Sequence, residues 1–477
     1  MRVPLLLSLV FVFTIASVHA AQLHVGAATI DITPDQPVAL DGQRNVRISK
    51  KVDTHLFATA LAIESREGDR VVDQAVFVSC DLVAIRQGIL AKVREKIGTR
   101  LPGVDLKKVF LNATHTHTAP VTVEGRYALP ETGIMQPAAY AEWMAARIAD
   151  GIIEAWQKRQ PAKVAWGQSQ AVIAQNRRPY YADGTAVMYG KPDSPNFRGI
   201  ESYEDHNLEV LYFWDATDKL MATIVNVPCP SQEVGGNSNI HADFWDPVRT
   251  RLREKHGQDL HILAWTGAGG DVTSRLAYGR DADDRMRKLR GNVSRLDEMA
   301  RRIVNAWEEA LDGAKHDIRA EAVLQHQVQD IELPYRKITI LEKAAAMTEA
   351  AKFKDDPKQQ WNYLWNQRVV DRFTAQQNGS LEPFVMELHT LRLGDVAIAS
   401  NEFELYTDFG VQMKARSPAV QTFVIQLAGS AGYLPTERAM KHGGYGAVIQ
   451  SGQIGPDGGQ LLVEKTVESL LTMWEKK

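Results

Sequence analysis

Residues 109–120 read Val109-Phe110-Leu111-Asn112-Ala113-Thr114-His115-Thr116-His117-Thr118-Ala119-Pro120. The apolar start of this stretch predicts a buried strand, and Pro120 ends it. Alternate side chains of an extended strand share one face, so His115 and His117 are expected to point the same way. One imidazole could bind a metal ion while its neighbour faces a substrate on that metal. The alternative interpretation is a pair of hydrogen-bonded histidines at the end of a strand.

The composition narrows the class of protein. The chain has 477 residues, enough for one large domain or two fused lobes. Its 55 Lys and Arg residues nearly balance 58 Asp and Glu residues, and no basic run or stripe is present, which argues against a nucleic-acid-binding protein.

The first twenty residues are predicted to be a secretory signal peptide. Arg2 is followed by the apolar run Leu5–Val18 and then by small residues before Ala21. No later stretch is apolar enough for a transmembrane helix. We therefore expect a secreted or periplasmic protein without a transmembrane segment, whose contact with a membrane is at most a transient one at its surface.

The order of predicted elements indicates an α/β (α+β) fold with a mixed β-sheet core flanked by helices. Apolar runs predict six strands, and helical spacing of apolar residues predicts helices between them. The strands are expected at 75–79, 108–112, 163–166, 208–214, 222–226 and 261–265, and the helices at 138–158, 246–256 and 294–311.

The second half of the chain changes character. Longer antiparallel strands are expected at 321–333 and 384–400, separated by a charged helical insertion at about 342–377. Trp361 and Trp365 lie at helical spacing in this insertion, and we interpret them as packing residues rather than ligand-stacking ones. No domain boundary is evident, so residues 21–477 are expected to form one catalytic domain.

Four further segments carry residues suited to chemistry. Paired arginines at 177 and 178 could clamp a carboxylate or an oxyanion. Residues 226–243 offer a thiol, an amide, an imidazole and a carboxylate. The glycine-rich turn at 267–274 ends in hydroxyls that could act as nucleophiles. Glu402 follows an apolar strand, where a carboxylate is a plausible zinc ligand. Each segment taken alone also has a purely structural interpretation.

In this order, and with two tyrosines at 433 and 445, these segments resemble the neutral/alkaline (non-lysosomal) ceramidase family. The resemblance covers almost the whole mature chain. It begins at 25–34 and includes Asn112–His117, Asn176-Arg177, Gly270–Thr273, Asn401–Phe403 and the two tyrosines. It implies a zinc-dependent amidase that cleaves the N-acyl bond of ceramide into sphingosine and a fatty acid.

The resemblance also implies roles for individual residues. His115, Glu402 and Tyr433 would be zinc ligands. His117, Arg177 and Tyr445 would surround the substrate carbonyl and the developing oxyanion. Thr273 falls where the family has its nucleophilic serine.

The sequence departs from the family at three places. The family's second zinc histidine is missing, and either Cys229 or His241 is expected to replace it. Threonine stands in place of the nucleophilic serine, so attack by a zinc-activated water is an alternative to attack by Thr273. The further C-terminal β-sandwich domain that many members carry is not expected here.

Two classes of function follow from these departures. The first is an exported zinc-dependent hydrolase that cleaves an amide or an ester. Its small-molecule or lipid substrate is ceramide or another acylated compound, such as an acylated sugar. The second is a catalytically silent binding protein on the same scaffold.

Overall fold

A computed structural model describes residues 20–475 of the chain. The predicted signal peptide, residues 1–20, lies outside these residues except for its last position. Within residues 20–475, no helix is both long enough and apolar enough to cross a membrane.

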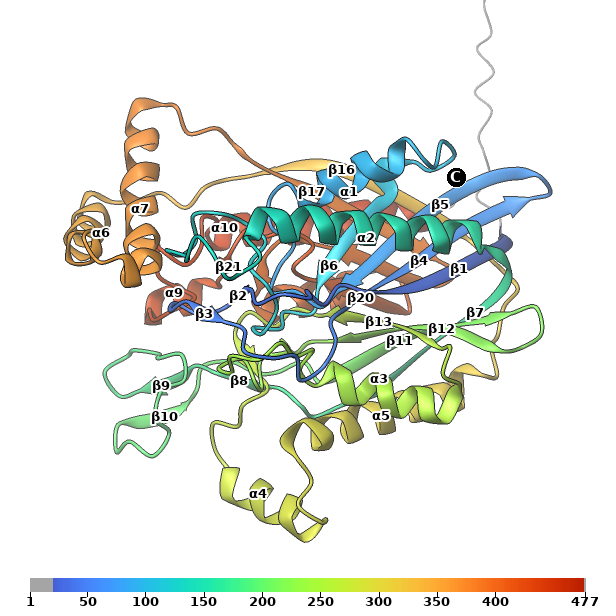
Figure 1. Ribbon diagram of the computed structural model, residues 1–477, viewed down its shortest axis with the longest axis horizontal. Helices are drawn as coiled ribbons and strands as arrows, with labels where there is room; N and C mark the ends of the chain where they lie inside the picture. Colours follow the sequence, from blue (N-terminus) through green and yellow to red (C-terminus); the bar gives the residue numbers. More distant parts are fainter. Residues whose placement is uncertain (1–19, 476–477) are drawn as a thin grey trace, which may run out of the picture.

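A large mixed sheet forms the centre of the molecule (Figure 1). Its strands follow the order β13-β12-β11-β7-β1-β4-β5-β6, and β15 also pairs with β1. Most neighbours are antiparallel, but β5 and β6 are parallel, as are β12 and β13. The strands are β1 (Ala21–Asp31), β4 (Phe57–Glu67), β5 (Arg70–Cys80), β6 (Val109–Ala113), β7 (Gln160–Gln170), β11 (Asn207–Asp215), β12 (Leu220–Val227), β13 (His261–Thr266) and β15 (Glu321–Ala322).

Helices cover the outer face of this sheet in two groups. Helices α1 (Ile89–Gly98) and α2 (Pro137–Gln157) pack on one half, and α3 (Trp245–His256) and α5 (Arg295–Ala314) pack on the other. The apolar positions of α2 recur at helical spacing and are buried against the sheet, as the sequence predicted.

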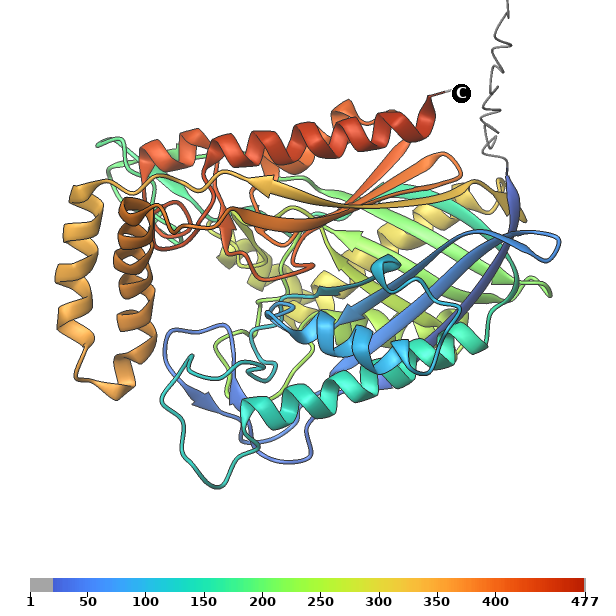
Figure 2. The ribbon, with the colours of Figure 1, turned by 90° about the horizontal axis from the view of Figure 1, so that it is seen from above.

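A second sheet packs against the inner face. It has the strand order β16-β17-β18-β20, and α8 (Thr407–Arg416) and α10 (Pro456–Trp474) cover its far side. Apolar side chains of both sheets share one core cluster, so the molecule has four layers, α-β-β-α (Figure 2). The strands are β16 (Leu324–Leu333), β17 (Phe384–Leu393), β18 (Val396–Ser400) and β20 (Gln421–Ile425).

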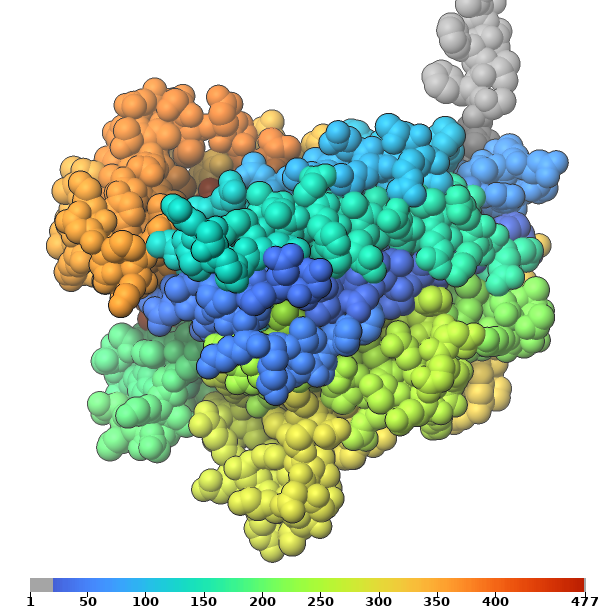
Figure 3. Space-filling view, in the orientation of Figure 1, coloured from blue at the N-terminus to red at the C-terminus, as the bar shows by residue number. Residues whose placement is uncertain are grey.

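The predicted insertion forms a helical hairpin at one end of the molecule (Figure 3). It consists of α6 (Ile340–Phe353), the short η2 (Pro357–Gln359) and α7 (Gln360–Asn378). Helix α4 (Arg280–Leu289) protrudes separately from the body. The remaining elements are short: β2 (Ala39–Leu40), β3 (Arg47–Ile48), η1 (Leu106–Lys108), β8 (Gln175–Asn176), β9 (Pro179–Tyr181), β10 (Phe197–Ile200), β14 (Val272–Thr273), β19 (Glu404–Leu405), β21 (Tyr433–Leu434) and α9 (Glu437–His442).

Three parallel strand pairs place the candidate residues at one end of the two sheets. The loops that follow β6, β12, β13, β18 and β20 carry most of these residues, and they are joined by backbone hydrogen bonds. Ala113 N donates to Leu427 O (3.2 Å), Gln426 N to Thr266 O (2.9 Å) and Gly270 N to Leu405 O (2.7 Å). Ligands commonly bind outside the carboxyl ends of parallel strands, and the site described next lies there.

Candidate active site

A cavity of about 1170 Å³ opens at this end of the sheets. It is bounded by the loops after β6, β12, β18 and β20 and by helix α7 of the hairpin. The volume is somewhat above the range of roughly 300–1,000 Å³ that is usual for small-molecule sites. Five of the residues singled out in the sequence line it: His115, His117, Arg177, Tyr433 and Tyr445.

The two histidines meet through a bent loop and not through an extended strand. Strand β6 ends at Ala113, and His115 has a φ of 68°, in the left-handed region. Such a backbone is uncommon for a residue other than glycine and occurs often at functional sites. The expectation that both side chains lie on one face of an extended strand is therefore wrong, because the strand ends before either histidine. The loop nevertheless brings the two Nε2 atoms within 3.3 Å of each other.

Neighbouring groups orient these two rings. His115 is buried, and its Nδ1 lies 2.6 Å from Val83 O, so Nδ1 donates to that carbonyl and Nε2 faces His117. Gln232 directs its Oε1 towards Arg177 (3.4 Å), which leaves its Nε2 to donate to His117 Nε2 (3.0 Å). Burial, together with His115, holds the pKa of His117 well below its usual value. The unprotonated Nε2 of His117 thus faces the Nε2 of His115.

Glu404 is the cavity carboxylate that lies beside His115. Its Oε2 lies 3.4 Å from His115 Nε2 and 4.0 Å from an Arg177 Nη2. Burial opposes its ionisation, but His115 and Arg177 outweigh burial, and the pKa of Glu404 lies below its usual value. Strand β19 pairs in parallel with β21, where Glu404 is the direct partner of Tyr433. The pairing places a carboxylate and a phenol side by side next to His115.

Arg177 is a fixed positive charge within the cavity wall. Its Nη2 donates to Gly270 O (2.8 Å) and to the Tyr433 hydroxyl (3.1 Å), and its Nη1 donates to the Tyr189 hydroxyl (2.8 Å). The side chain is 3% exposed, and the surrounding oxygens keep it protonated despite burial. The Gly270 contact explains why the glycine-rich turn matters, since it holds the guanidinium in place.

The two tyrosines form the adjoining part of the cavity wall. Their rings meet edge to face, with centroids 5.5 Å apart. Burial raises the pKa of both hydroxyls, and Glu404 raises them further, so both phenols are neutral in the absence of a bound cation. Neutral phenols are hydrogen-bond donors towards the cavity.

Comparison with solved structures gives the fold a name. Neutral ceramidase from Pseudomonas aeruginosa matches with a TM-score of 0.69 and 17% identity, over 95% of this chain and 74% of that one. A ceramidase complexed with C2 matches with a TM-score of 0.68 and 15% identity, over 95% of this chain and 75% of that one. This chain has the neutral ceramidase fold. Protein family models and curated protein sequences give no match.

The structure places Glu402 outside the cavity, although the resemblance had assigned it as a ligand. The chain bends at residues 401–403, where Asn401 Oδ1 accepts from Phe403 N (3.1 Å), and this bend separates Glu402 from Glu404. The Glu402 side chain packs on Gly429, where an added Cβ would lie 2.4 Å from its Cγ. Burial raises the pKa of Glu402 to about 7. The structure therefore brings Glu404 to His115 in its place.

Neither expected replacement for the missing histidine lines the cavity. Cys229 is buried in the core beneath α3, and its Sγ faces the carbonyl oxygens of Ile173 and Pro230 at 4.0 and 3.7 Å. His241 turns its Nδ1 back to accept from Asp243 N (2.8 Å). Within residues 20–475 both cysteines are free, because Cys80 and Cys229 lie in separate core clusters.

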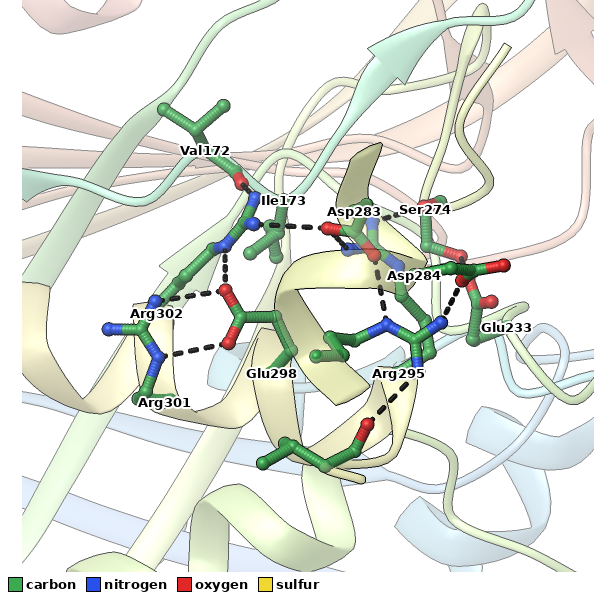
Figure 4. A network of polar contacts seen from close by, with 12 residues as sticks. Val172, Ile173, Glu233, Ser274, Asp283, Asp284, Arg295, Glu298, Arg301 and Arg302 are labelled. Carbon is green, nitrogen blue, oxygen red and sulfur yellow. Dashed lines mark hydrogen bonds and ion pairs between the residues drawn. The ribbon is translucent and has the colours of Figure 1, made fainter. Parts of the chain in front are cut away.

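The two hydroxyls of the glycine-rich turn also lie off the cavity. Thr273 is 1% exposed, and its Oγ1 accepts from Arg275 N (3.2 Å). Ser274 donates to Glu233 (2.9 Å) at the edge of a polar network that involves Arg295 and helix α4 (Figure 4). No contact recorded in the described part of the chain joins Thr273 to His117.

Sequence reasoning missed two features of the site. Gln232 lies in the segment 226–243, for which only the thiol and the imidazole were proposed as ligands. The amide of Gln232 is the group that contacts His117. Trp361 and Trp365 were interpreted as packing residues. They do stack on each other (5.6 Å), but both line the cavity and Trp365 packs against Tyr445 (5.9 Å).

The donors around His115 fit a zinc ion with three protein ligands. Within residues 20–475, no three His, Cys, Asp or Glu side chains are spaced to hold a metal ion. A zinc set here therefore depends on the phenol of Tyr433 together with His115 and Glu404. An imidazole nitrogen of His115 beside an ionised carboxylate is the chemistry that zinc prefers. The Val83 carbonyl would orient the imidazole, as partners of ligating histidines commonly do.

Proposed function

We propose that this chain is a zinc-dependent amidohydrolase that cleaves an N-acyl amide bond. One observation carries the proposal: His115, His117, Glu404, Arg177 and Tyr433 converge in one cavity of a protein with the neutral ceramidase fold. The solved relatives are hydrolases by name, and that activity is extended to this chain only as a proposal. Export through the predicted signal peptide is part of the same proposal.

His115, Glu404 and Tyr433 would hold the zinc. When bound, zinc would supply Lewis acidity to a substrate carbonyl and lower the pKa of a bound water. Its positive charge would also lower the pKa of Tyr433, which burial raises in its absence.

His117 would move the proton. Its depressed pKa keeps the ring neutral at pH 7, so its Nε2 can take a proton from an attacking water. The same nitrogen can then return the proton to the leaving amine. Gln232, which donates to this nitrogen while it is unprotonated, would hold the ring in place before the proton is taken.

Arg177 and Tyr445 would stabilise the oxyanion. A fixed guanidinium and a neutral phenol in a buried wall need little reorganisation when charge develops on the carbonyl oxygen. The hydrogen bonds of Arg177 to Gly270 and to two tyrosine hydroxyls give it that rigidity. A water nucleophile accords with the position of Thr273, whose side chain lies off the cavity.

A screen of acyl hydrolysis tests the proposal. The purified protein is incubated with ceramide, N-acylated amino acids and N-acylated sugars, and release of free amine is followed. Release of amine from at least one class is expected, and it should be lost in His115→Ala. The second candidate, a silent binding protein, is favoured by the short ligand set. It predicts binding without amine release from any class.

A further inference from the structure

Arginines dominate the charged lining of the cavity. Seven arginines line it, against three carboxylates, Glu124, Asp371 and Glu404. Glu404 is the carboxylate beside His115. The rest of the cavity, towards helix α7, therefore carries an excess of positive charge.

One buried carboxylate serves two of these arginines. Asp41 pairs with Arg86 (2.8 Å) and with Arg126 (2.6 Å), and its side chain is 3% exposed. The two guanidiniums hold the pKa of Asp41 well below its usual value although burial opposes this. One negative charge against two positive charges leaves a net positive charge at this wall.

Arg368 adds a third guanidinium from helix α7. Among residues 20–475 it forms no ion pair within 4.0 Å and no side-chain hydrogen bond. Burial lowers its pKa, and the like charges of Arg126 and Arg86 lower it further. Guanidiniums gathered without a matching acid are electrostatically unfavourable until an anion joins them.

A small side pocket lies between these arginines. It has a volume of about 40 Å³ and is lined by Arg126, Arg368, Trp361, Trp365 and Leu364. A single water needs roughly 10–15 Å³ of such volume, so a group of a few heavy atoms fits. Its lining has two guanidiniums, two indoles and no acid.

Aromatic contacts connect this side pocket to the catalytic residues. The Arg44 guanidinium lies over the rings of Trp361, Trp365 and Tyr445 at 5.2, 5.0 and 4.9 Å. Tyr445 in turn packs on Tyr433. A substrate with its amide beside His117 can therefore extend along this wall towards Arg368.

We propose that the substrate carries a small anionic group, a carboxylate or a phosphate, which binds between Arg126 and Arg368. Guanidiniums bind both groups in a bidentate manner, and the indoles exclude water around the pair. This inference rests on the proposed function, because it names the substrate class of the same cavity. It favours acylated amino acids or phosphorylated acyl sugars over ceramide, which has no charge.

Two matched pairs of ligands test the proposal by calorimetric binding. Hippurate is compared with its neutral amide, and N-acetylglucosamine 6-phosphate is compared with N-acetylglucosamine. At low salt we expect at least one anion to bind about tenfold or more tighter than its neutral partner. The advantage should shrink as salt is added. An advantage in the hippurate pair indicates a site for a carboxylate, and an advantage in the sugar pair indicates a site for a phosphate.

Two variants locate the effect. Arg368→Gln should reduce the anion advantage to about threefold or less and leave neutral ligands unchanged. Arg285→Gln removes the same charge from the exposed surface of α4 and should retain the advantage. Equal binding of both members in both pairs, or equal losses in the two variants, would overturn the proposal.

Binding and turnover separate the two claims. An anion advantage that depends on Arg368, without amine release from any substrate, supports the subsite and contradicts the hydrolase proposal. Amine release from neutral amides without any anion advantage supports the hydrolase and contradicts the subsite.

Discussion

Glu404 Oε2 lies 3.4 Å from His115 Nε2, whereas Glu402, two residues earlier, packs against Gly429 outside the cavity. This pair of glutamates provides an internal comparison. Both are largely buried, but burial raises the pKa of Glu402 to about 7 whereas His115 and Arg177 keep Glu404 ionised.

The first prediction concerns zinc affinity. Glu404→Gln removes a charged zinc ligand. Substituting a residue that only orients a ligand usually lowers zinc affinity by about 10–100-fold, so we expect the loss of a ligand itself to lower it by more than about 100-fold. Glu402→Gln is the matched control and should bind zinc as the wild type does. Competition with a chromogenic chelator measures both. Zinc loss in the Glu402 variant alone would restore the assignment made from the sequence.

The second prediction concerns proton transfer. His117→Ala should lower kcat by about 10²–10⁴-fold, the usual contribution of a general acid or base, while the zinc content stays unchanged. Amine release and elemental analysis on the same preparation measure the two effects. If the variant loses its zinc as well, His117 is a ligand and the proposed division of roles is incorrect.

A third prediction covers the residues that lie off the cavity. Cys229→Ala, His241→Ala and Thr273→Ala should each retain about one zinc per chain and activity within roughly tenfold of the wild type, because none of these side chains lines the cavity. Zinc content and amine release are measured for each folded variant. A loss of activity of about 10³-fold in Thr273→Ala would instead identify the threonine as the nucleophile.

The fourth prediction concerns pH and stability. Burial raises the pKa of Glu402 in the fold to about 7, against an ordinary value of 4.5. The stabilising contribution of neutral Glu402 to the free energy of unfolding is fully present below pH 4.5. It is lost as the pH rises towards 7, because Glu402 ionises at a lower pH in the unfolded chain than in the fold. At about 1.4 kcal/mol per pKa unit, the cost above pH 7 is on the order of 3 kcal/mol.

Glu402→Gln stays neutral at every pH and should avoid this cost. Urea unfolding at pH 4, 6 and 8 should show the variant close to the wild type at pH 4 and more stable than it at pH 8. Parallel pH profiles for the two proteins would show that Glu402 is ionised in the fold.

Much of the central sheet could be predicted from the sequence. Strands buried on both faces are continuous apolar runs, and all six that were expected are present, as are the helices with apolar residues on one face. How the second sheet packs on the first could not be predicted. That packing joins residues far apart in the chain, such as Asn226, whose side chain donates to Val424 O (3.1 Å).

The candidate site was predictable by segment but not always by residue. His115, His117, Arg177, Tyr433 and Tyr445 were expected and do line one cavity. Bends decided the rest. The bend at Asn401 places Glu404 instead of Glu402 in the cavity. In the loop after β12, the thiol of Cys229 lies in the core whereas the amide of Gln232 reaches His117. A pattern of residue types does not record such local bends.

The position of Trp361 and Trp365 relative to the cavity could not be predicted from the sequence either. Their helical spacing correctly predicted that they share a face of one helix. Which surface that face would meet depended on where the hairpin α6–α7 lies. The hairpin stands at one end of the molecule (Figures 1 and 2), and side chains of α7 line the cavity.

The most direct test of the account is the rate of amine release from an N-acyl amide before chelation, after removal of metal, and after zinc is added back. We predict a rate that is lost with the metal and recovered when about one zinc per chain is restored. A rate that is unchanged in metal-free protein would contradict the central claim.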